Sequence, residues 1–194
     1  MHEHAPIFNA FAALLRYPEH GPEACVTAVE NARAAAKAAG TGSATFFQRL
    51  EGLREFFATQ TLKDLEERYT QTFDINPAVT LDAGFHLFGL SYKRGTFLVK
   101  LQESLREAGL DKGTELADHL PVLLELAAAL PAPEASEFIA ECVAFPVRRM
   151  TAGFPPGEAG YASVIATLND YLKDNFGCVE ITQGEDDKCL DQSW

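Results

Sequence analysis

The sequence predicts an all-α protein, a single-domain helical bundle of about eight to nine helices. Apolar residues recur at helical spacing along most of the chain, which indicates helices with one buried face. Strand signals are weak, because there is no alternation of strands with helices and no repeat of fixed period. A length of 194 residues with 47% apolar residues suits one domain. We assign residues 1–174 to this domain and residues 175–194 to an irregular C-terminal tail.

Proline and glycine separate the helices expected in the first half of the chain. An apolar face that begins at Ile7 ends at Pro18, and the Ala-rich stretch 22–39 ends at Gly40. A third helix is expected over residues 46–57, where apolar residues again recur at helical spacing. Thr61 then stands as an N-cap, with an Asp three residues later that approximates a capping box. This fourth helix is expected to end before Pro77.

The second half begins with a loop and continues with further helices. Ser91 is a candidate cap for a helix that ends near Gly109. The next helix opens around residues 118–121 and runs through Leu130, because proline is tolerated in a first turn. Residues 133–150 are predicted to be helical, with a kink or an end of the helix at Pro146. The last helix spans residues 161–172.

Composition excludes several classes of function. The chain carries 16 Lys+Arg against 28 Asp+Glu, a net charge of −12. This charge repels nucleic acid and anionic membrane surfaces and suits a basic partner. No run of about 18 apolar residues exists to span a bilayer. The N-terminus also lacks the basic region followed by an apolar stretch that is typical of a secretory signal. The expected compartment is the cytoplasm.

Motifs of catalysis and cofactor binding are missing from the sequence. It contains no GxSxG, no Gly-rich phosphate loop and no HExxH. The cysteines Cys25, Cys142, Cys178 and Cys189 form no CxxC pair, so we expect reduced thiols rather than a metal site. We therefore predict no catalytic residues, no metal and no cofactor.

Three segments depart from local rules, which is common at functional sites. The first ends in Asp74, which falls at a helix C-terminus, where its negative charge opposes the macrodipole. Either the carboxylate folds back onto the loop amides before Pro77, or it faces a groove and awaits a basic ligand group.

The second segment surrounds His86 with large apolar residues. Phe85 and Phe88 flank it, and Tyr92 and Arg94 follow a glycine. Either this is a core plug with a hydrogen-bonded histidine, or it is an aromatic wall for a peptide groove.

The third segment joins Asp118 and His119 at the start of a helix, with Glu125 about two turns farther on. Taken by itself, Asp118 is typical of a helix N-cap residue. A carboxylate and an imidazole at a free helix N-terminus also make a polar anchor for a ligand.

Taken in order, these segments resemble the molybdoenzyme-specific chaperones, a family that includes the nitrate reductase delta subunit (NarJ type) and the TorD/DmsD group. The resemblance runs through Leu65-Glu66-Glu67-Arg68-Tyr69-Thr70-Gln71-Thr72-Phe73-Asp74, His86-Leu87-Phe88-Gly89, Arg94-Gly95 and Glu115-Leu116-Ala117-Asp118-His119-Leu120-Pro121-Val122-Leu123-Leu124-Glu125.

The resemblance implies a cytoplasmic protein of one all-α domain without catalysis. Such a chaperone binds the N-terminal, twin-arginine-type segment of a molybdoenzyme catalytic subunit and assists insertion of the molybdenum cofactor before export or membrane attachment. The details favour the nitrate reductase class of client. The expected state is a monomer or a domain-swapped dimer, between which the sequence does not decide. Two alternatives stay open. One is a structural subunit of a redox complex, and the other is a small helical hydrolase that uses Asp118 and His119.

The resemblance also assigns roles to residues. Asp74, Asp118 and Glu125 would pair with arginines of the ligand, and His119 would contact the ligand or orient the site. The apolar part of the ligand would meet Tyr69, Phe85, Phe88 and Tyr92. The predicted client-binding set is completed by His86 and Arg94.

Overall fold

Helices make up the fold, as the sequence predicts. The structure is a computed structural model that describes residues 2–177, and no β-strand occurs in this range. The elements in chain order are α1 (Ala5–Leu15), α2 (Gly21–Ala39), α3 (Ala44–Ala58), α4 (Leu62–Tyr69), the π-turn η1 (Thr70–Asp74), the 3₁₀ turn η2 (Pro77–Val79), α5 (Ala83–Phe88), α6 (Tyr92–Glu107), α7 (Leu120–Ala129), α8 (Ala132–Phe138), the π-turn η3 (Ile139–Val143), α9 (Ala144–Gly153) and α10 (Tyr161–Phe176).

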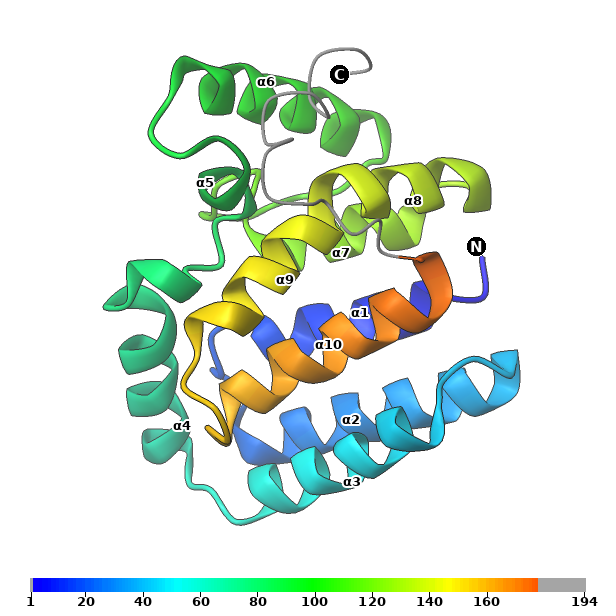
Figure 1. Cartoon of the computed structure of the whole chain (residues 1–194), viewed down its shortest axis with the longest axis vertical. Coiled ribbons are helices and arrows are strands. Elements are labelled where there is room, and N and C mark those ends of the chain that lie inside the picture. Colours follow the sequence, from blue (N-terminus) through cyan, green and yellow to red (C-terminus); the bar gives the residue numbers. More distant parts are fainter. Residues whose placement is uncertain (1, 178–194) are drawn as a thin grey trace.

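The central element is α1, which contacts α2, α7 and α10. Most of its side chains are buried, among them Phe8, Phe11 and Leu14. A helix that is apolar nearly all round has to be enclosed by other helices. Figure 1 shows this enclosure: α1 lies beside α10 in the middle of the molecule, α2 and α3 lie below it, and α7 to α9 lie above it.

An aromatic cluster fastens α10 to the left side of the molecule in Figure 1. The ring of Tyr161 lies 5.5 Å from Tyr69, 5.4 Å from Phe73 and 6.2 Å from Phe57, measured between centroids. Such edge-to-face pairs contribute about 0.5–1.5 kcal/mol each beyond their burial. Burial also raises the pKa of the Tyr161 phenol well above its usual value. This packing fixes the position of α4 and η1, and with them Asp74.

Two helices change pitch where the sequence contains a break. The fourth helix passes into the π-turn η1 before Pro77, and the helical run expected over residues 133–150 is interrupted by the π-turn η3. Pro146 follows η3 within the first turn of α9. Because proline has no N–H to donate, the wider turn just before it accommodates the missing hydrogen bond.

The stretch expected to be a loop between Pro77 and Ser91 is partly helical. It contains η2 and the short helix α5, which the sequence pattern did not predict. Gly84 and Gly89 lie inside and at the end of α5 and lower its helix propensity. Tertiary contacts, described below, supply what local propensity lacks.

The helix ends match the expectations in part. Thr61 and Asp64 form the predicted capping box. Ser91 is an N-cap without a side-chain hydrogen bond, and the N-cap of α7 is His119 rather than Asp118. The last helix extends to Phe176, beyond Leu172. The irregular tail was predicted for residues that, from 178 onward, lie outside the described residues.

The structure also bears on the cysteines and on membrane association. Cys25 and Cys142 are buried free thiols, and burial raises their pKa values to about 11 and about 12. Within residues 2–177, none of the helices combines the length and the apolar character that crossing a membrane requires.

The capping box gives a prediction for stability. The Thr61 hydroxyl accepts from the Asp64 N–H at 3.2 Å, and the Asp64 carboxylate accepts from the Thr61 N–H at 3.1 Å. We expect Thr61→Ala to lower the free energy of unfolding by about 1 kcal/mol in urea titrations. Ser91→Ala is the matched control, because Ser91 occupies an N-cap without a cap hydrogen bond, and its loss should be below about 0.5 kcal/mol. Equal losses would contradict this account of the two caps.

Candidate functional site

The second and third segments singled out in the sequence meet through a short backbone bridge. An isolated antiparallel bridge pairs Asp82 with His119. The Ala83 N–H donates to the carbonyl of Asp118 at 2.8 Å, and the Leu120 N–H donates to the carbonyl of Leu81 at 2.8 Å. The bridge therefore joins the residues before α5 to the start of α7. It also brings the side chains of Asp82 and Asp118 to one place.

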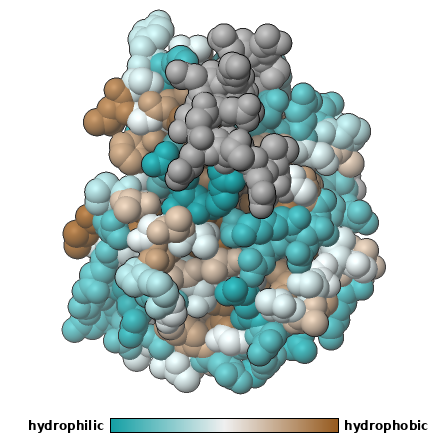
Figure 2. All heavy atoms as spheres, viewed as in Figure 1, coloured by the Kyte–Doolittle hydropathy of each residue, from teal (hydrophilic) through white to brown (hydrophobic). Residues whose placement is uncertain are grey.

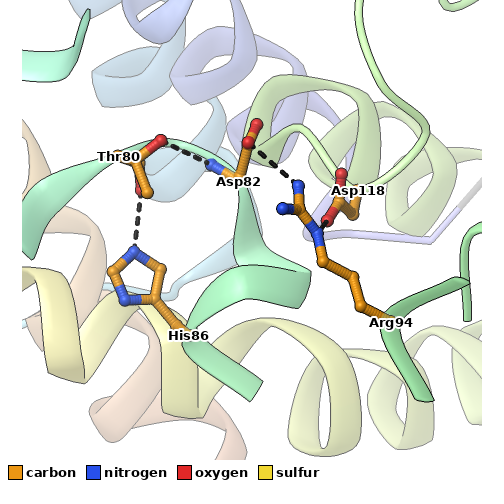
Figure 3. Close-up of polar contacts among 5 residues, drawn as sticks. All are labelled: Thr80, Asp82, His86, Arg94 and Asp118. Carbon is orange, nitrogen blue, oxygen red and sulfur yellow. Dashed lines mark hydrogen bonds and ion pairs between the residues drawn. The ribbon is translucent and has the colours of Figure 1, made fainter. Parts of the chain in front are cut away.

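One arginine from α6 links these two carboxylates (Figure 3). Arg94 donates from Nε to Asp118 at 2.8 Å and from a terminal nitrogen to Asp82 at 2.9 Å. The Asp118 side chain is fully buried, whereas Asp82 is 32% exposed. Burial alone would lower the pKa of Arg94, but its hydrogen bonds to Asp118 and Asp82 raise it, so the guanidinium stays charged. Charge-assisted pairs of this kind are strong when desolvated.

A glycine makes this ion pair possible. A methyl group added at Gly84 would fall on the carboxylate oxygen of Asp118 that binds Arg94. It would also lie 3.3 Å from Cγ of Arg94 and 3.2 Å from the Phe97 ring. The low helix propensity of α5 therefore has a packing reason, which is the close approach of Asp118 and Arg94 to its backbone.

Two polar atoms beside the Arg94–Asp118 ion pair lack hydrogen bonds. The second oxygen of Asp118, Oδ1, and the Nδ1 atom of His119 are buried without a hydrogen-bond partner in the described part of the chain. Burial lowers the pKa of His119, although the nearby carboxylates of Glu115 and Asp82 oppose the shift. The imidazole is therefore mainly neutral at pH 7 and does not balance the carboxylates. Buried atoms left without partners are uncommon in proteins and call for an explanation.

His86 has a role in the fold. It is buried, and its Nε2 atom lies 2.8 Å from the carbonyl of Thr80, which fastens α5 to the residues after η2. Burial lowers the pKa of His86. Of its predicted neighbours, Phe85 and Phe88 are half-buried, and the Phe88 ring packs against Phe97 at 5.2 Å. These contacts match the interpretation as a core plug.

Two other predicted residues are engaged inside the chain. Glu125 accepts from Arg16 through both carboxylate oxygens, one bonded by Nε at 3.1 Å and the other by a terminal nitrogen at 2.7 Å. The buried Tyr69 hydroxyl donates to the carbonyl of Leu15 at 3.1 Å. Asp118 and Glu125, expected to pair with arginines of the ligand, and Tyr69, expected to meet its apolar part, each already have a partner from another helix or loop.

Asp74 is different, because its carboxylate is exposed and makes no side-chain hydrogen bond to any of residues 2–177. The loop before Pro77 is instead fastened by Asn76, whose side chain accepts from the Ala78 N–H at 3.1 Å. Tyr17 lies nearby: desolvation, followed by the carboxylates of Glu66 and Asp74, raises its pKa. Asp74 is thus available to a partner.

Asp74 and Glu115 both act on the buried phenol of Tyr69. Burial raises the pKa of Tyr69, Asp74 and Glu115 add to this shift, and Arg16 opposes it. Glu115, Asp82, Arg16 and Asp118 in turn act on His119. We name this set the acidic cluster: Asp74, Asp82, Glu115, Asp118 and Glu125, with Arg16 and Arg94. It holds five carboxylates and two guanidinium groups.

Exposed hydrophobic side chains flank the acidic cluster. Tyr17 is 44% exposed, Ile75 69% and Leu116 47%, and each adjoins a member of the cluster in sequence. Leu90 and Tyr92, both 91% exposed, precede Arg94. Figure 2 shows hydrophobic surface at the left edge and the upper left, where η1–η2 and the α5–α6 turn lie in Figure 1. A ligand that combines positive charge with apolar side chains fits this surface.

Sequence reasoning missed Arg16, Tyr17, Glu66, Asp82 and Glu115 as members or neighbours of the site. Glu66 and Glu115 lie within the quoted motifs, which was the available signal, whereas Arg16 and Asp82 have partners that are distant in sequence. The described residues also form a pocket of about 290 Å³ bounded by Arg68, Thr72 and Glu158, among others, and none of the predicted site residues lines it.

Comparisons with known proteins agree with the resemblance seen in the sequence. A family model described as nitrate reductase delta subunit matches residues 42–150. The chain is 28% identical over 178 residues to the probable nitrate reductase molybdenum cofactor assembly chaperone NarJ of Bacillus subtilis, an alignment that covers 91% of this chain and 93% of that protein. It is 39% identical over 75 residues to the nitrate reductase molybdenum cofactor assembly chaperone NarJ of Escherichia coli K12, covering 38% of this chain and 32% of that protein.

The close approach at Gly84 gives a prediction. We expect Gly84→Ala to displace Asp118 from Arg94 and to lower the free energy of unfolding by about 3 kcal/mol in urea titrations, because a buried charge loses its partner.

Gly95→Ala in α6 is the matched control. A methyl group there meets no atom within 4 Å. This change should raise stability by roughly 0.5–1 kcal/mol through helix propensity alone. A neutral effect of Gly84→Ala would mean that the ion pair does not depend on this close approach.

Proposed function

Because the chain belongs to the nitrate reductase delta subunit family, we propose that it is a molybdenum cofactor assembly chaperone for a molybdoenzyme of the nitrate reductase class. The family role is that of a chaperone rather than of a catalytic enzyme. In this proposal the protein binds the catalytic subunit of its client and keeps it open for insertion of the molybdenum cofactor. It acts in the cytoplasm, as a monomer or domain-swapped dimer, before the client is exported or attached to the membrane.

We further propose that the acidic cluster binds the N-terminal, twin-arginine-type segment of that subunit. The observation that carries this proposal is the excess of carboxylates over guanidinium groups in the cluster, with Asp74 and Glu115 exposed and Asp82 half-buried. A segment with two arginines supplies the missing positive charges. The exposed Tyr17, Ile75 and Leu116 suit the apolar residues that follow such arginines.

The proposal divides the predicted site residues by exposure. Asp74 contacts the ligand directly, together with Asp82 and Glu115, and Tyr92 and Leu90 extend the apolar contact. Asp118 and His119 are buried behind these residues. In the free protein Asp118 binds Arg94, and His119 supports the backbone bridge.

A second candidate is a structural subunit that stays in the mature redox complex. The exposed hydrophobic residues around the acidic cluster would favour it, because an apolar surface is also typical of permanent interfaces. The two candidates differ in the composition of the finished enzyme.

Affinity capture tests the role. We expect the tagged protein, purified from its host during anaerobic respiration on nitrate, to bring down one molybdoenzyme catalytic subunit that lacks its cofactor. Mass spectrometry and molybdenum analysis of the eluate measure both features. If the protein instead remains stoichiometric with the molybdenum-loaded enzyme, the structural subunit is the correct role. If no molybdoenzyme is captured, the client assignment fails.

Peptide binding tests the site. We expect Asp74→Asn to weaken binding of a fluorescent twin-arginine peptide about two- to five-fold at about 10 mM salt, because one exposed ion pair is lost. The difference should disappear near 1 M salt, where charges are screened beyond about 3 Å.

The matched control for this experiment is Asp174→Asn. It removes an exposed carboxylate from the last turns of α10, far from η1 in Figure 1, and should leave the affinity unchanged. Equal weakening by both variants would indicate a general charge effect rather than a contact at Asp74.

A further inference from the structure

Arg94 occupies the place that the proposed function assigns to an arginine of the client. Its guanidinium is bound to both Asp82 and Asp118, and its side chain is only 15% exposed. We propose that Arg94 is an internal competitor for the client's arginine: the incoming guanidinium replaces it on Asp82 and Asp118, and its release detaches the first turn of α6. This inference rests on the proposed function and adds to it a mechanism of exchange.

The negative charge of the site attracts the guanidinium of the client. Asp82 and Asp118 carry two negative charges, and Arg94 supplies one positive charge to them. His119 adds none, since burial keeps its imidazole mainly neutral. Asp118 is fully buried and His119 is 8% exposed, yet Oδ1 of Asp118 and Nδ1 of His119 lack partners. An arriving guanidinium carries several N–H donors, which is the group that the unpaired Oδ1 atom of Asp118 requires.

The entrance to the site lies at Asp82. This residue is 32% exposed, whereas its partner Asp118 is not exposed at all. A guanidinium from outside therefore meets Asp82 first and competes there with the terminal nitrogen of Arg94. Loss of this contact leaves Arg94 with the Nε contact to Asp118 alone. Exchange can thus proceed one carboxylate at a time, without an intermediate in which both carboxylates are unpaired.

The first turn of α6 has few other attachments. Tyr92 is 91% exposed, Ser91 makes no cap hydrogen bond, and Gly95 has no side chain. The next buried residue is Phe97, which packs against Phe88, and Leu101 and Leu105 follow it. In Figure 1, α6 lies at the upper edge of the molecule and packs on α5. Arg94 is therefore the residue that fastens the start of α6, while the rest of the helix is held by its apolar side chains.

Exchange of one guanidinium for another changes the energy of the site little, so the cost of binding is the release of the first turn of α6. A site that is already filled binds more weakly than a vacant one, because part of the binding energy displaces the occupant. The affinity for the client is then moderate and reversible, which suits a partner that has to leave after assembly.

Hydrogen exchange of the wild-type protein tests the proposal without any substitution. We expect a twin-arginine peptide to speed exchange of the α6 amides in residues 94–98, although ligands ordinarily protect the helices that they touch. The control peptide replaces both arginines by citrulline, which keeps the shape and removes the charge, and it should leave these amides unchanged. Protection of residues 94–98 by the arginine peptide would overturn the proposal.

Variants test the competition directly. We expect Arg94→Gln to bind the arginine peptide more tightly than the wild-type protein, roughly tenfold, because the site is vacant in the free protein. The gain should vanish in the double variant Arg94→Gln/Asp82→Asn, which removes the entrance carboxylate. Arg94→Lys should lie between the wild type and Arg94→Gln, because lysine lacks the planar fork that bridges two carboxylates.

The outcomes separate the two proposals. If the wild-type protein does not bind the arginine peptide, the proposed function and this inference fail together. If it binds, but α6 becomes protected or Arg94→Gln binds more weakly while remaining helical by circular dichroism, Arg94 is a structural residue and only this inference fails. If Arg94→Gln does not fold, the exchange of residues 94–98 in the wild-type protein decides the matter.

Discussion

The buried carboxylate of Asp118 is the constraint on which the upper half of the molecule depends. A fully buried charge is costly unless it is paired, and its partner Arg94 comes from α6. That pairing needs Gly84 at the point of closest approach and the backbone bridge that aligns α5 with the start of α7. One charge therefore determines where three segments lie, although it contributes little apolar area itself.

The same interaction explains why the chain tolerates a weak helix. The glycines of α5 would be unfavourable in an isolated peptide. In the folded protein, His86 binds the carbonyl of Thr80 and Phe88 packs on Phe97. These contacts hold α5 in place, so the segment that is least stable by propensity lies between the ion pair and the core.

The acidic cluster combines structural and binding carboxylates. Asp118 and Glu125 are neutralised by arginines of the chain, whereas Asp74 and Glu115 remain exposed. The net charge of −12 therefore has a local meaning, because the internal arginines leave an excess of negative charge next to exposed hydrophobic side chains. An isolated surface charge attracts any cation, but this combination selects a ligand that is both basic and apolar.

The sequence by itself determined the fold class, the capping box at Thr61 and the acidity of the chain, because helical periodicity and capping depend on residues within a few positions of one another. It also indicated Asp74 as an unusual carboxylate. Only the tertiary structure decided that Asp118 forms an ion pair with Arg94. The two residues are 24 positions apart, on elements whose relative placement no local pattern encodes. The helix α5 was missed for the same reason, since long-range contacts rather than propensity stabilise it.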